Sequence, residues 1–191
     1  MLDDLITSKT RVKLLNCFLS NLGEMYHVRE LVRRVDEEIN AVRRELLILE
    51  KKGILKKEPR ANRVYYYLDK NYTYYYDLVN LYAKSYGLGA DVIKNRVKIG
   101  KIKYAMLSGK FARRVEVTPE NVDLLVVGTV VLPELSIYVK REEESLGREI
   151  NYTVMTEEEF SFRKKRNDPF IGSILIGSRI MLIGDEESMV G

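Results

Sequence analysis

Apolar side chains recur at helical spacing through the first part of the chain and then alternate with polar ones in two short runs. The helical spacing predicts three helices, over residues 5–19, around Leu31, and over residues 38–52. A short strand, at residues 26–28, is expected just before the second helix. Together with the alternating runs, these elements are assigned to one domain over residues 1–69.

The helix over residues 38–52 has one apolar stripe and one polar face. Its inward-facing positions are Ile39, Val42, Leu46 and Leu49. The same period turns three polar side chains to the opposite side, and these are Asn40, Arg43 and Arg44. Asp36 is the expected N-cap because a short acid accepts hydrogen bonds from the first free N–H groups, and Gly53 is the expected C′ residue.

Two strands and a basic turn follow this helix. Alternation predicts strands at residues 54–58 and 64–68, joined by a Pro-Arg-Ala-Asn turn. Residues 43–63 contain eight Lys and Arg against three Asp and Glu. Residues 1–84 hold 16 basic and 12 acidic side chains, whereas residues 85–191 hold 16 of each, so the net charge of +4 belongs to the first half. This distribution favours a polyanionic partner for the helix and hairpin.

Three phrases in this region resemble the winged helix-turn-helix of transcriptional regulators of the arsenical-resistance and multidrug-resistance types. They are LVRRV from Leu31, NAVRRELLILEKKGIL from Asn40, and RVYYYL from Arg63. The resemblance covers about the first third of the chain. It implies sequence-specific binding of double-stranded DNA with the third helix in the major groove. It also implies a homodimer, because the helix after the wing commonly packs against its two-fold mate in such regulators.

The resemblance and the charge pattern together assign a set of DNA contacts. Arg43 and Arg44 are expected to contact guanine and Asn40 to contact adenine, through base edges in the major groove. The residues expected to take phosphates or to reach the adjacent minor groove are Lys57, Arg60, Asn62 and Arg63. The alternative for Arg43 and Arg44 is an ion pair with an acid about one helical turn away. The candidate acids are Glu37, Glu38 and Glu50.

Residues 71–86 are rich in tyrosine and lie in a stretch, residues 70–98, that is expected to form linker helices. One interpretation is that the rings form a dimer contact. The other is that they cover the joint between two domains, with their hydroxyl groups in water. The sequence leaves both interpretations open.

From residue 99 onward, strand-like apolar runs alternate with helical segments. Strands are predicted at residues 102–107, 122–127, 149–154 and 179–183. Helical segments are predicted at residues 133–146 and 157–176, and residues 184–191 are expected to be a polar tail. Such alternation predicts a layered α/β domain over residues 99–191, and the chain as a whole is expected to belong to the α+β class.

This second half resembles the minimal branch of the DNA-polymerase-β-type nucleotidyltransferase superfamily. The phrases that carry the resemblance are LSGKFAR from Leu107, NVDLLVVG from Asn121 and GREINYTV from Gly147. Active members of that superfamily have a Gly-Ser turn, an Asp-x-Asp pair and a third carboxylate. The carboxylates hold two divalent metals that bridge the triphosphate and activate the attacking hydroxyl group.

Position by position, the catalytic pattern is mostly missing from this chain. Gly109 keeps the turn glycine, but Lys110 stands in the place of the serine. Asn121 and Asn151 occupy the first and third carboxylate positions, and only Asp123 is kept. Because an amide supplies one weak oxygen ligand and no charge, the domain is expected to be inactive, with no metal and no cofactor.

Two roles are then open for this domain: a body for dimerisation, or a sensor of a small anionic effector. The residues that would contact such an anion are Gly109, Lys110, Arg113, Arg114 and Asp123. The alternative for the two arginines is that they are merely solvated. A different class of function, nucleotidyl transfer of the toxin–antitoxin type with residual activity, stays as the second hypothesis, and a winged helix that binds protein stays as the third.

The remaining chemistry of the chain is sparse. His27 is the only histidine and is expected at the start of a helix, not as a metal ligand. Cys17 is the only cysteine, so no internal disulfide forms, and it is expected to be a small buried apolar residue. No apolar run is long enough to span a membrane and no signal peptide is recognisable, so a cytoplasmic protein is expected.

Overall fold

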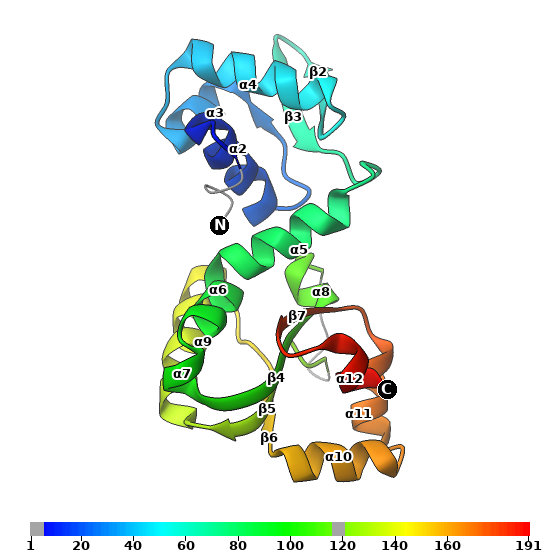
Figure 1. Cartoon of the computed structure of the whole chain (residues 1–191). Coiled ribbons are helices and arrows are strands. Elements are labelled where there is room, and N and C mark those ends of the chain that lie inside the picture. The colour runs from blue at the N-terminus through cyan, green and yellow to red at the C-terminus, as the bar shows by residue number, and fades with distance from the viewer. Residues whose placement is uncertain (1–5, 116–120) are drawn as a thin grey trace. The chain divides into compact units, whose positions relative to one another are not determined.

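The structure is a computed structural model that describes residues 6–115 and 121–191. It belongs to the α+β class and divides into two compact units, unit 1 (Met1–Tyr82) and unit 2 (Ala83–Gly191). Figure 1 labels the helices and strands of both units except β1. No helix within the described ranges is long and apolar enough to cross a membrane.

Unit 1 combines a helical cluster with a small antiparallel sheet. Its elements in chain order are α2 (Lys9–Ser20), β1 (Tyr26–His27), α3 (Val28–Val35), α4 (Ile39–Lys51), β2 (Leu55–Arg60) and β3 (Arg63–Leu68). The strands are arranged in the order β1-β3-β2, with both pairings antiparallel. The apolar stripe predicted for α4 is inside, since Val42, Leu46 and Leu49 are all buried.

The first two helices of unit 1 begin where a side chain caps them. The helix predicted from residue 5 begins at Lys9, and the Oγ atom of Ser8 accepts a hydrogen bond from the N–H group of Arg11 at 3.2 Å. Leu5 lies outside the described residues. His27 is the N-cap of α3, as predicted, because its Nδ1 atom accepts a hydrogen bond from the N–H group of Glu30 at 3.2 Å.

The prediction that Asp36 caps α4 is wrong. Asp36 ends α3 with a left-handed backbone (φ 50°), and its N–H group donates to the carbonyl of Val32. Helix α4 has Glu38 at its N-cap position, without a capping hydrogen bond from that side chain. The left-handed residue turns the chain between the two helices, so a single residue cannot also begin the second one. Gly53 follows the C-cap of α4 with φ 74°, as predicted.

Helix α5 (Tyr75–Ser85) crosses the division between the units, and α6 (Gly87–Lys94) and α7 (Arg96–Ile99) belong to unit 2. The segment predicted as linker helices is therefore shared between the two units. Ala83, Leu88 and Val92 are buried in one core cluster of unit 2.

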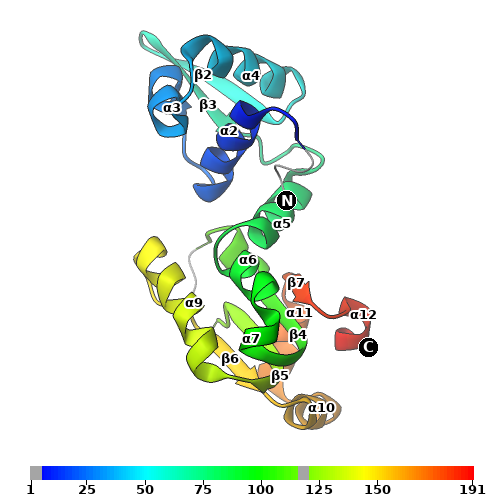
Figure 2. The same cartoon turned by 60° about the vertical axis from the view of Figure 1, so that its left-hand side comes forward.

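Unit 2 is a mixed sheet with helices on both faces. Its further elements are β4 (Gly100–Ser108), α8 (Gly109–Ala112), β5 (Leu124–Val130), α9 (Leu132–Leu146), β6 (Tyr152–Met155), α10 (Glu157–Lys165), α11 (Pro169–Ile176), β7 (Arg179–Ile183) and α12 (Glu186–Val190). The strand order is β6-β5-β4-β7, in which only the β5–β6 pairing is parallel. Figure 2 shows α9 and α12 on opposite sides of this sheet.

Successive side chains of the central strands point to opposite faces of the sheet and so contribute to two separate cores. Ala105 and Leu107 of β4 face the core that contains α6 and α9, whereas Tyr104 and Met106 face the core under α10, α11 and α12. Both faces of a strand between two helical layers must be apolar, and this explains the unbroken run of buried residues in β5. The polar tail predicted for residues 184–191 is wrong, because these residues include helix α12 and its Met189 is fully buried.

Candidate functional site

The exposed face of α4 carries the three residues predicted to contact bases. Asn40, Arg43 and Arg44 are all exposed, as the helical period requires when Val42 and Leu46 are inside. Within the described ranges, neither arginine has an ion pair or a hydrogen bond from its side chain. Their charges are therefore free for a partner outside the chain.

The acids considered as alternative partners for Arg43 and Arg44 are turned elsewhere. Glu37 accepts from Lys13 at 2.7 Å, and Glu50 accepts from Lys57 at 2.8 Å. The hydrogen bond from Lys13 lowers the pKa of the Glu37 carboxyl group below its usual range. The ion-pair alternative for Arg43 and Arg44 is thus not realised among the described residues.

The first turn of α4 has neither an acidic side chain nor a capping hydrogen bond. The first N–H groups of the helix are therefore satisfied only from outside. The aligned peptide dipoles place a partial positive charge at this end. This partial charge favours an anion at the end of the helix that carries Asn40, Arg43 and Arg44. The carboxylate of Glu38 at the N-cap position opposes it, whereas that of Glu37 is paired with Lys13.

Helix α4 is held in place by a buried acid. The carboxylate of Glu45, which is only 8% exposed, accepts from the Nε atom of Arg11 at 2.7 Å and from the hydroxyl group of Ser8 at 2.7 Å. Both donors belong to the beginning of α2. This contact ties α4 to the beginning of α2, and together with the buried Val42, Leu46 and Leu49 it holds the polar face of α4 toward solvent.

The hairpin is tighter than predicted. Strands β2 and β3 extend to Arg60 and Arg63, which are paired in register, and only Ala61 and Asn62 form the turn. Ala61 takes a left-handed conformation (φ 48°), which closes the turn in two residues. Asn62 and Arg63 are exposed, and the Arg63 side chain has no polar partner among the described residues.

Two of the hairpin residues predicted to contact DNA already have an acidic partner within unit 1. Lys57 binds Glu50, and this hydrogen bond raises the pKa of the lysine. The Nε atom of Arg60 lies 2.7 Å from a carboxylate oxygen of Glu58, and its guanidinium group stands 5.9 Å from the centre of the Tyr65 ring. Both cations remain about half exposed, so they are accessible but partly neutralised.

A hollow of about 470 Å³ lies beside the start of α4, and we call it the arginine hollow. Its walls are Arg29 and Arg33 of α3 and Arg63 of β3, and its other lining residues are His27, Val32 and Ile39. Among the described residues, none of the three arginines has an ion pair. The hollow therefore gathers three uncompensated guanidinium groups above a partly apolar floor.

Sequence reasoning missed Arg29 and Arg33. They lie four residues apart on α3, and their neighbours Leu31 and Val35 are buried, so helical periodicity alone turns both arginines outward. Arg34, the third arginine of α3, does not line the hollow. It is paired with Glu30 at 3.0 Å and lies 4.8 Å from the Tyr26 ring centre. The four-residue spacing of Arg29 and Arg33 could therefore have predicted that both lie on the exposed face of α3.

In unit 2, the predicted anion contacts are all occupied by neighbours. Lys110 donates to the side-chain oxygen of Asn121 at 2.9 Å, and Arg113 donates to the hydroxyl group of Ser178 at 3.2 Å. Arg114 lies 4.0 Å from a carboxylate oxygen of Glu142. The three cations thus have three different partners.

The turn glycine of unit 2 has a packing explanation. Gly109 begins α8 after the cap residue Ser108, and its N–H group donates to the carbonyl of Ser178 at 2.7 Å. A Cβ atom at Gly109 would collide with the side chain of Ser178. Close approach of β7 therefore requires glycine at this position whether or not a phosphate binds.

Asp123 is completely buried and is neutralised by a guanidinium group. Its Oδ2 atom accepts from Arg148 at 2.9 Å and from the N–H group of Asn151 at 3.3 Å. Its Oδ1 atom has no hydrogen-bond partner among the described residues. Arg148 also lies 5.3 Å from the Phe111 ring centre and donates to the carbonyl of Glu149. Sequence reasoning missed Arg148 as the counterion.

The described residues contain no group of three His, Cys, Asp or Glu side chains that could hold a metal ion. Asp123 is the one retained position of the predicted carboxylate set, and the cation beside it already balances its charge. A divalent metal there would have to displace Arg148 from a buried site.

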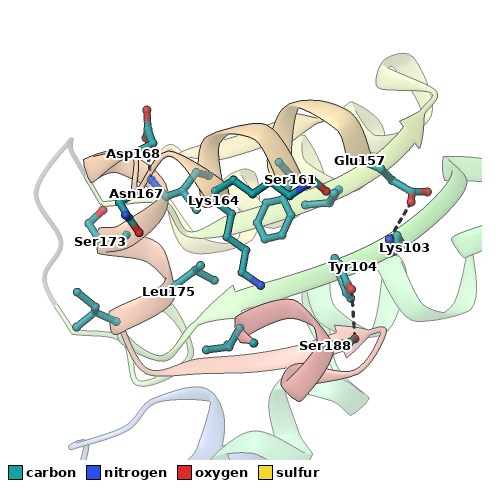
Figure 3. Close-up of a pocket in the computed structure, with 18 of the residues that line it drawn as sticks. Lys103, Tyr104, Glu157, Ser161, Lys164, Asn167, Asp168, Ser173, Leu175 and Ser188 are labelled. Atoms are coloured by element: carbon teal, nitrogen blue, oxygen red, sulfur yellow. Dashed lines mark hydrogen bonds and ion pairs between the residues drawn. The ribbon is translucent and has the colours of Figure 1, made fainter.

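A groove of about 880 Å³ opens in unit 2 between α10, α11, α12 and the start of β4. Figure 3 looks into it and shows its polar contacts: Lys103 with Glu157 at 3.0 Å, and the hydroxyl group of Tyr104 with that of Ser188 at 3.2 Å. Lys164 enters from α10 and donates to the carbonyl of Met189 at 3.0 Å. Because α12 was not predicted, neither was this groove.

Comparison of the chain with models of known protein families, with curated proteins and with solved structures finds no match.

Proposed function

We propose that unit 1 is a winged helix-turn-helix domain that binds double-stranded DNA, and that the chain is a sequence-specific transcriptional regulator acting as a homodimer. Unit 2 is, in this proposal, a nucleotidyltransferase-like domain without catalytic activity. The observation that carries the proposal is the set of exposed arginines on α4 and around the arginine hollow that have no acid to pair with in the described chain.

The proposed docking begins with α4. Its N-terminal half enters the major groove, where Arg43 and Arg44 donate to guanine and Asn40 pairs with adenine. The bare first turn of α4 and the arginine hollow then face the phosphates that border the groove. A positive helix end and three guanidinium groups together supply the charge that a DNA backbone requires.

The hairpin contributes through its tip. Asn62 is exposed at the turn and is free to reach the adjacent minor groove, whereas Arg63, which is unpaired in the described chain, takes a phosphate as part of the arginine hollow. Lys57 and Arg60 must first leave Glu50 and Glu58, and this exchange reduces what each contributes to binding. The support is therefore stronger for Asn62 and Arg63 than for Lys57 and Arg60.

The inactive role of unit 2 rests on Arg148 together with the amides at Asn121 and Asn151. Metal-assisted nucleotidyl transfer needs clustered carboxylates with free charge. The one remaining acid, Asp123, is buried against a guanidinium group at 2.9 Å. Incubation of the full chain with labelled nucleoside triphosphate and Mg²⁺ should therefore give no labelled product.

The test of the DNA-binding proposal is a change of one guanidinium group on α4. The Arg43→Ala variant should lose about 1–3 kcal/mol of binding free energy on the selected DNA site, and it should relax the preference at one base pair. A selection from random duplexes supplies the site, and fluorescence anisotropy at fixed salt measures the affinity.

The matched control is Arg96→Ala, which removes an exposed arginine of unit 2 and should leave binding unchanged. If Arg43→Ala lowers the affinity for specific and random DNA equally, Arg43 contacts a phosphate and not a base. If the parent chain binds no duplex, the proposed function itself is refuted.

A further inference from the structure

Helix α11 is an apolar helix of unit 2 with only part of its surface covered. Its sequence, PFIGSILI, contains no charged residue. Two of its isoleucines, Ile171 and Ile174, are buried in the core of unit 2, whereas Ile176 is 88% exposed. Val190 of α12 is 40% exposed and lines the same open groove as Ile176. Exposed apolar side chains that gather at a groove are typical of a contact surface for another macromolecule.

Gly172 lies on the same helix, and none of the described residues approaches it closely enough to require a glycine. A Cβ atom built on Gly172 would meet nothing within 4 Å, and the residue lies inside the helix. Glycine inside a helix is less favourable than alanine. A glycine that faces open space therefore makes room for something that approaches from outside.

The spacing of Gly172 and Ile176 makes α11 complementary to itself. The two residues lie equally far, in opposite directions, from residue 174. In an antiparallel pair of α11 helices related by a two-fold axis near residue 174, Ile176 of one subunit stands opposite Gly172 of the partner subunit, and the reverse contact follows by symmetry. The large exposed side chain thus meets the position that has no side chain.

The charges on either side of α11 suit the same pairing. Lys165 lies at the end of α10, just before α11, and Glu187 lies in α12, which follows α11 and β7. Neither has an ion pair among the described residues. Arg179 donates to the carbonyl of Gly177, just after α11, and to Glu186 at 2.9 Å, so the acidic start of α12 lies near the C-terminal end of α11, whereas Lys165 precedes its N-terminal end. Antiparallel pairing therefore brings the basic end of one α11 toward the acidic end of the other, whereas parallel pairing would bring like charges together.

We propose that α11 and the groove beside it form the homodimer interface of this chain, with a second copy as the occupant. Figure 3 shows the groove walls that the partner would contact, with Lys164 and Leu175 among the side chains turned toward the opening. This inference rests on the homodimer in the proposed function, and it chooses unit 2 over the tyrosine-rich residues 71–86 as the contact.

The test is the mass of the full chain in solution, measured by light scattering after gel filtration at micromolar concentration. The parent chain should show twice the single-chain mass of 22.2 kDa. Ile176→Asp should raise the dimer dissociation constant by about a hundredfold, because it places a charge in the centre of the apolar contact. Since the side chain is exposed, the fold should not change.

Gly172→Ala is the second variant, because a Cβ atom there meets nothing within 4 Å in the subunit, whereas it would collide with Ile176 of the partner subunit. It should also yield monomers. The matched control is Ile137→Asp, at an isoleucine of α9 that is 51% exposed, and it should leave the dimer intact. A dimer that persists in both α11 variants, or a parent chain that is monomeric, would overturn the inference.

A crosslink gives an independent measurement. Ser173→Cys, in a chain that also carries Cys17→Ser, should be joined to its copy in the partner subunit by a short bismaleimide crosslinker, because Ser173 lies at the edge of the proposed contact face. Ser145→Cys on α9 should not. The DNA proposal is tested separately: monomeric Ile176→Asp should still bind a single half-site through Arg43, and its failure to do so would concern unit 1 and not this interface.

Discussion

The cations of unit 1 and those of the α8 turn in unit 2 are alike in the sequence but differ in the structure. Both regions place basic side chains close to the beginning of a helix. In unit 1, Arg43, Arg44 and Arg63 have no polar partner in the described chain. In unit 2, Lys110 and Arg113 each donate to a neighbour of their own.

The difference teaches that a cluster of basic residues indicates a binding surface only when the chain leaves the charges unused. A cation that already has a partner must give up that interaction before it binds a ligand, so its net contribution is small. A solvated, unpaired cation keeps its full interaction for the ligand. The following predictions test this contrast.

The largest expected effect is on the stability of unit 2. Arg148→Ala leaves the buried carboxylate of Asp123 without its counterion. We expect a loss of about 2–3 kcal/mol, somewhat below the range for fully buried pairs because Arg148 is partly exposed. Urea unfolding followed by circular dichroism measures it, and the double variant with Asp123→Asn should recover part of the loss. Unchanged unfolding of the single variant would show that the pair is not structural.

The next effect concerns the anchoring of α4. Glu45→Gln removes the charge that binds Arg11 and weakens the contact with Ser8. The expected cost is about 1–2 kcal/mol in the unfolding free energy of unit 1. The matched control is Glu58→Gln, which breaks a surface pair and should cost about 0.5 kcal/mol or less. Equal effects of the two changes would contradict the anchoring role.

The contrast between the two cation sets is tested directly by DNA binding. Arg29→Ala and Arg33→Ala, which remove walls of the arginine hollow, should each weaken binding by about 1 kcal/mol on any duplex and reduce the salt dependence by about one phosphate contact. Lys110→Ala and Arg113→Ala should change neither quantity. Salt titrations of the anisotropy signal measure both, and the reverse ranking would move the binding surface to unit 2.

The smallest effect is a pH dependence in unit 1. The hydrogen bond from Lys13 lowers the pKa of Glu37 in the folded chain, so this acid stabilises unit 1 above its unfolded pKa and loses that contribution as the pH falls through the folded pKa. The pKa of Asp69 is lowered too, first by the N–H group of Asn71, and adds the same sign. Between about pH 6 and about pH 3, Glu37→Gln should therefore lose less thermal stability than the parent. Parallel curves would contradict this.

Periodicity predicted much of the fold. The stripe of α4, the role of His27 and the strand at residues 179–183 are confirmed, because each depends on residues close together in the chain. Asp36 was misplaced because the same residue could end one helix or cap the next, and its left-handed backbone ends α3. Only the geometry of the two helices decides between these roles.

The sites depended on contacts between distant residues. The Asp123–Arg148 pair joins positions 25 residues apart, and the Glu45–Arg11 pair joins positions 34 apart. A composition of many Lys, Arg, Asp and Glu allows a great number of such pairs. For that reason the sequence could propose Arg43 and Arg44 as free cations, but it could not show which basic residues elsewhere are engaged.

The bare first turn of α4 sets two properties of the molecule against each other. A serine or aspartate in place of Glu38 would cap the helix and make unit 1 more stable by about 0.5–2 kcal/mol. The same cap would occupy the N–H groups that an incoming phosphate would use. At this position a change that raises the stability of unit 1 is therefore expected to lower its affinity for DNA. A variant stabilised by such a cap should bind DNA more weakly.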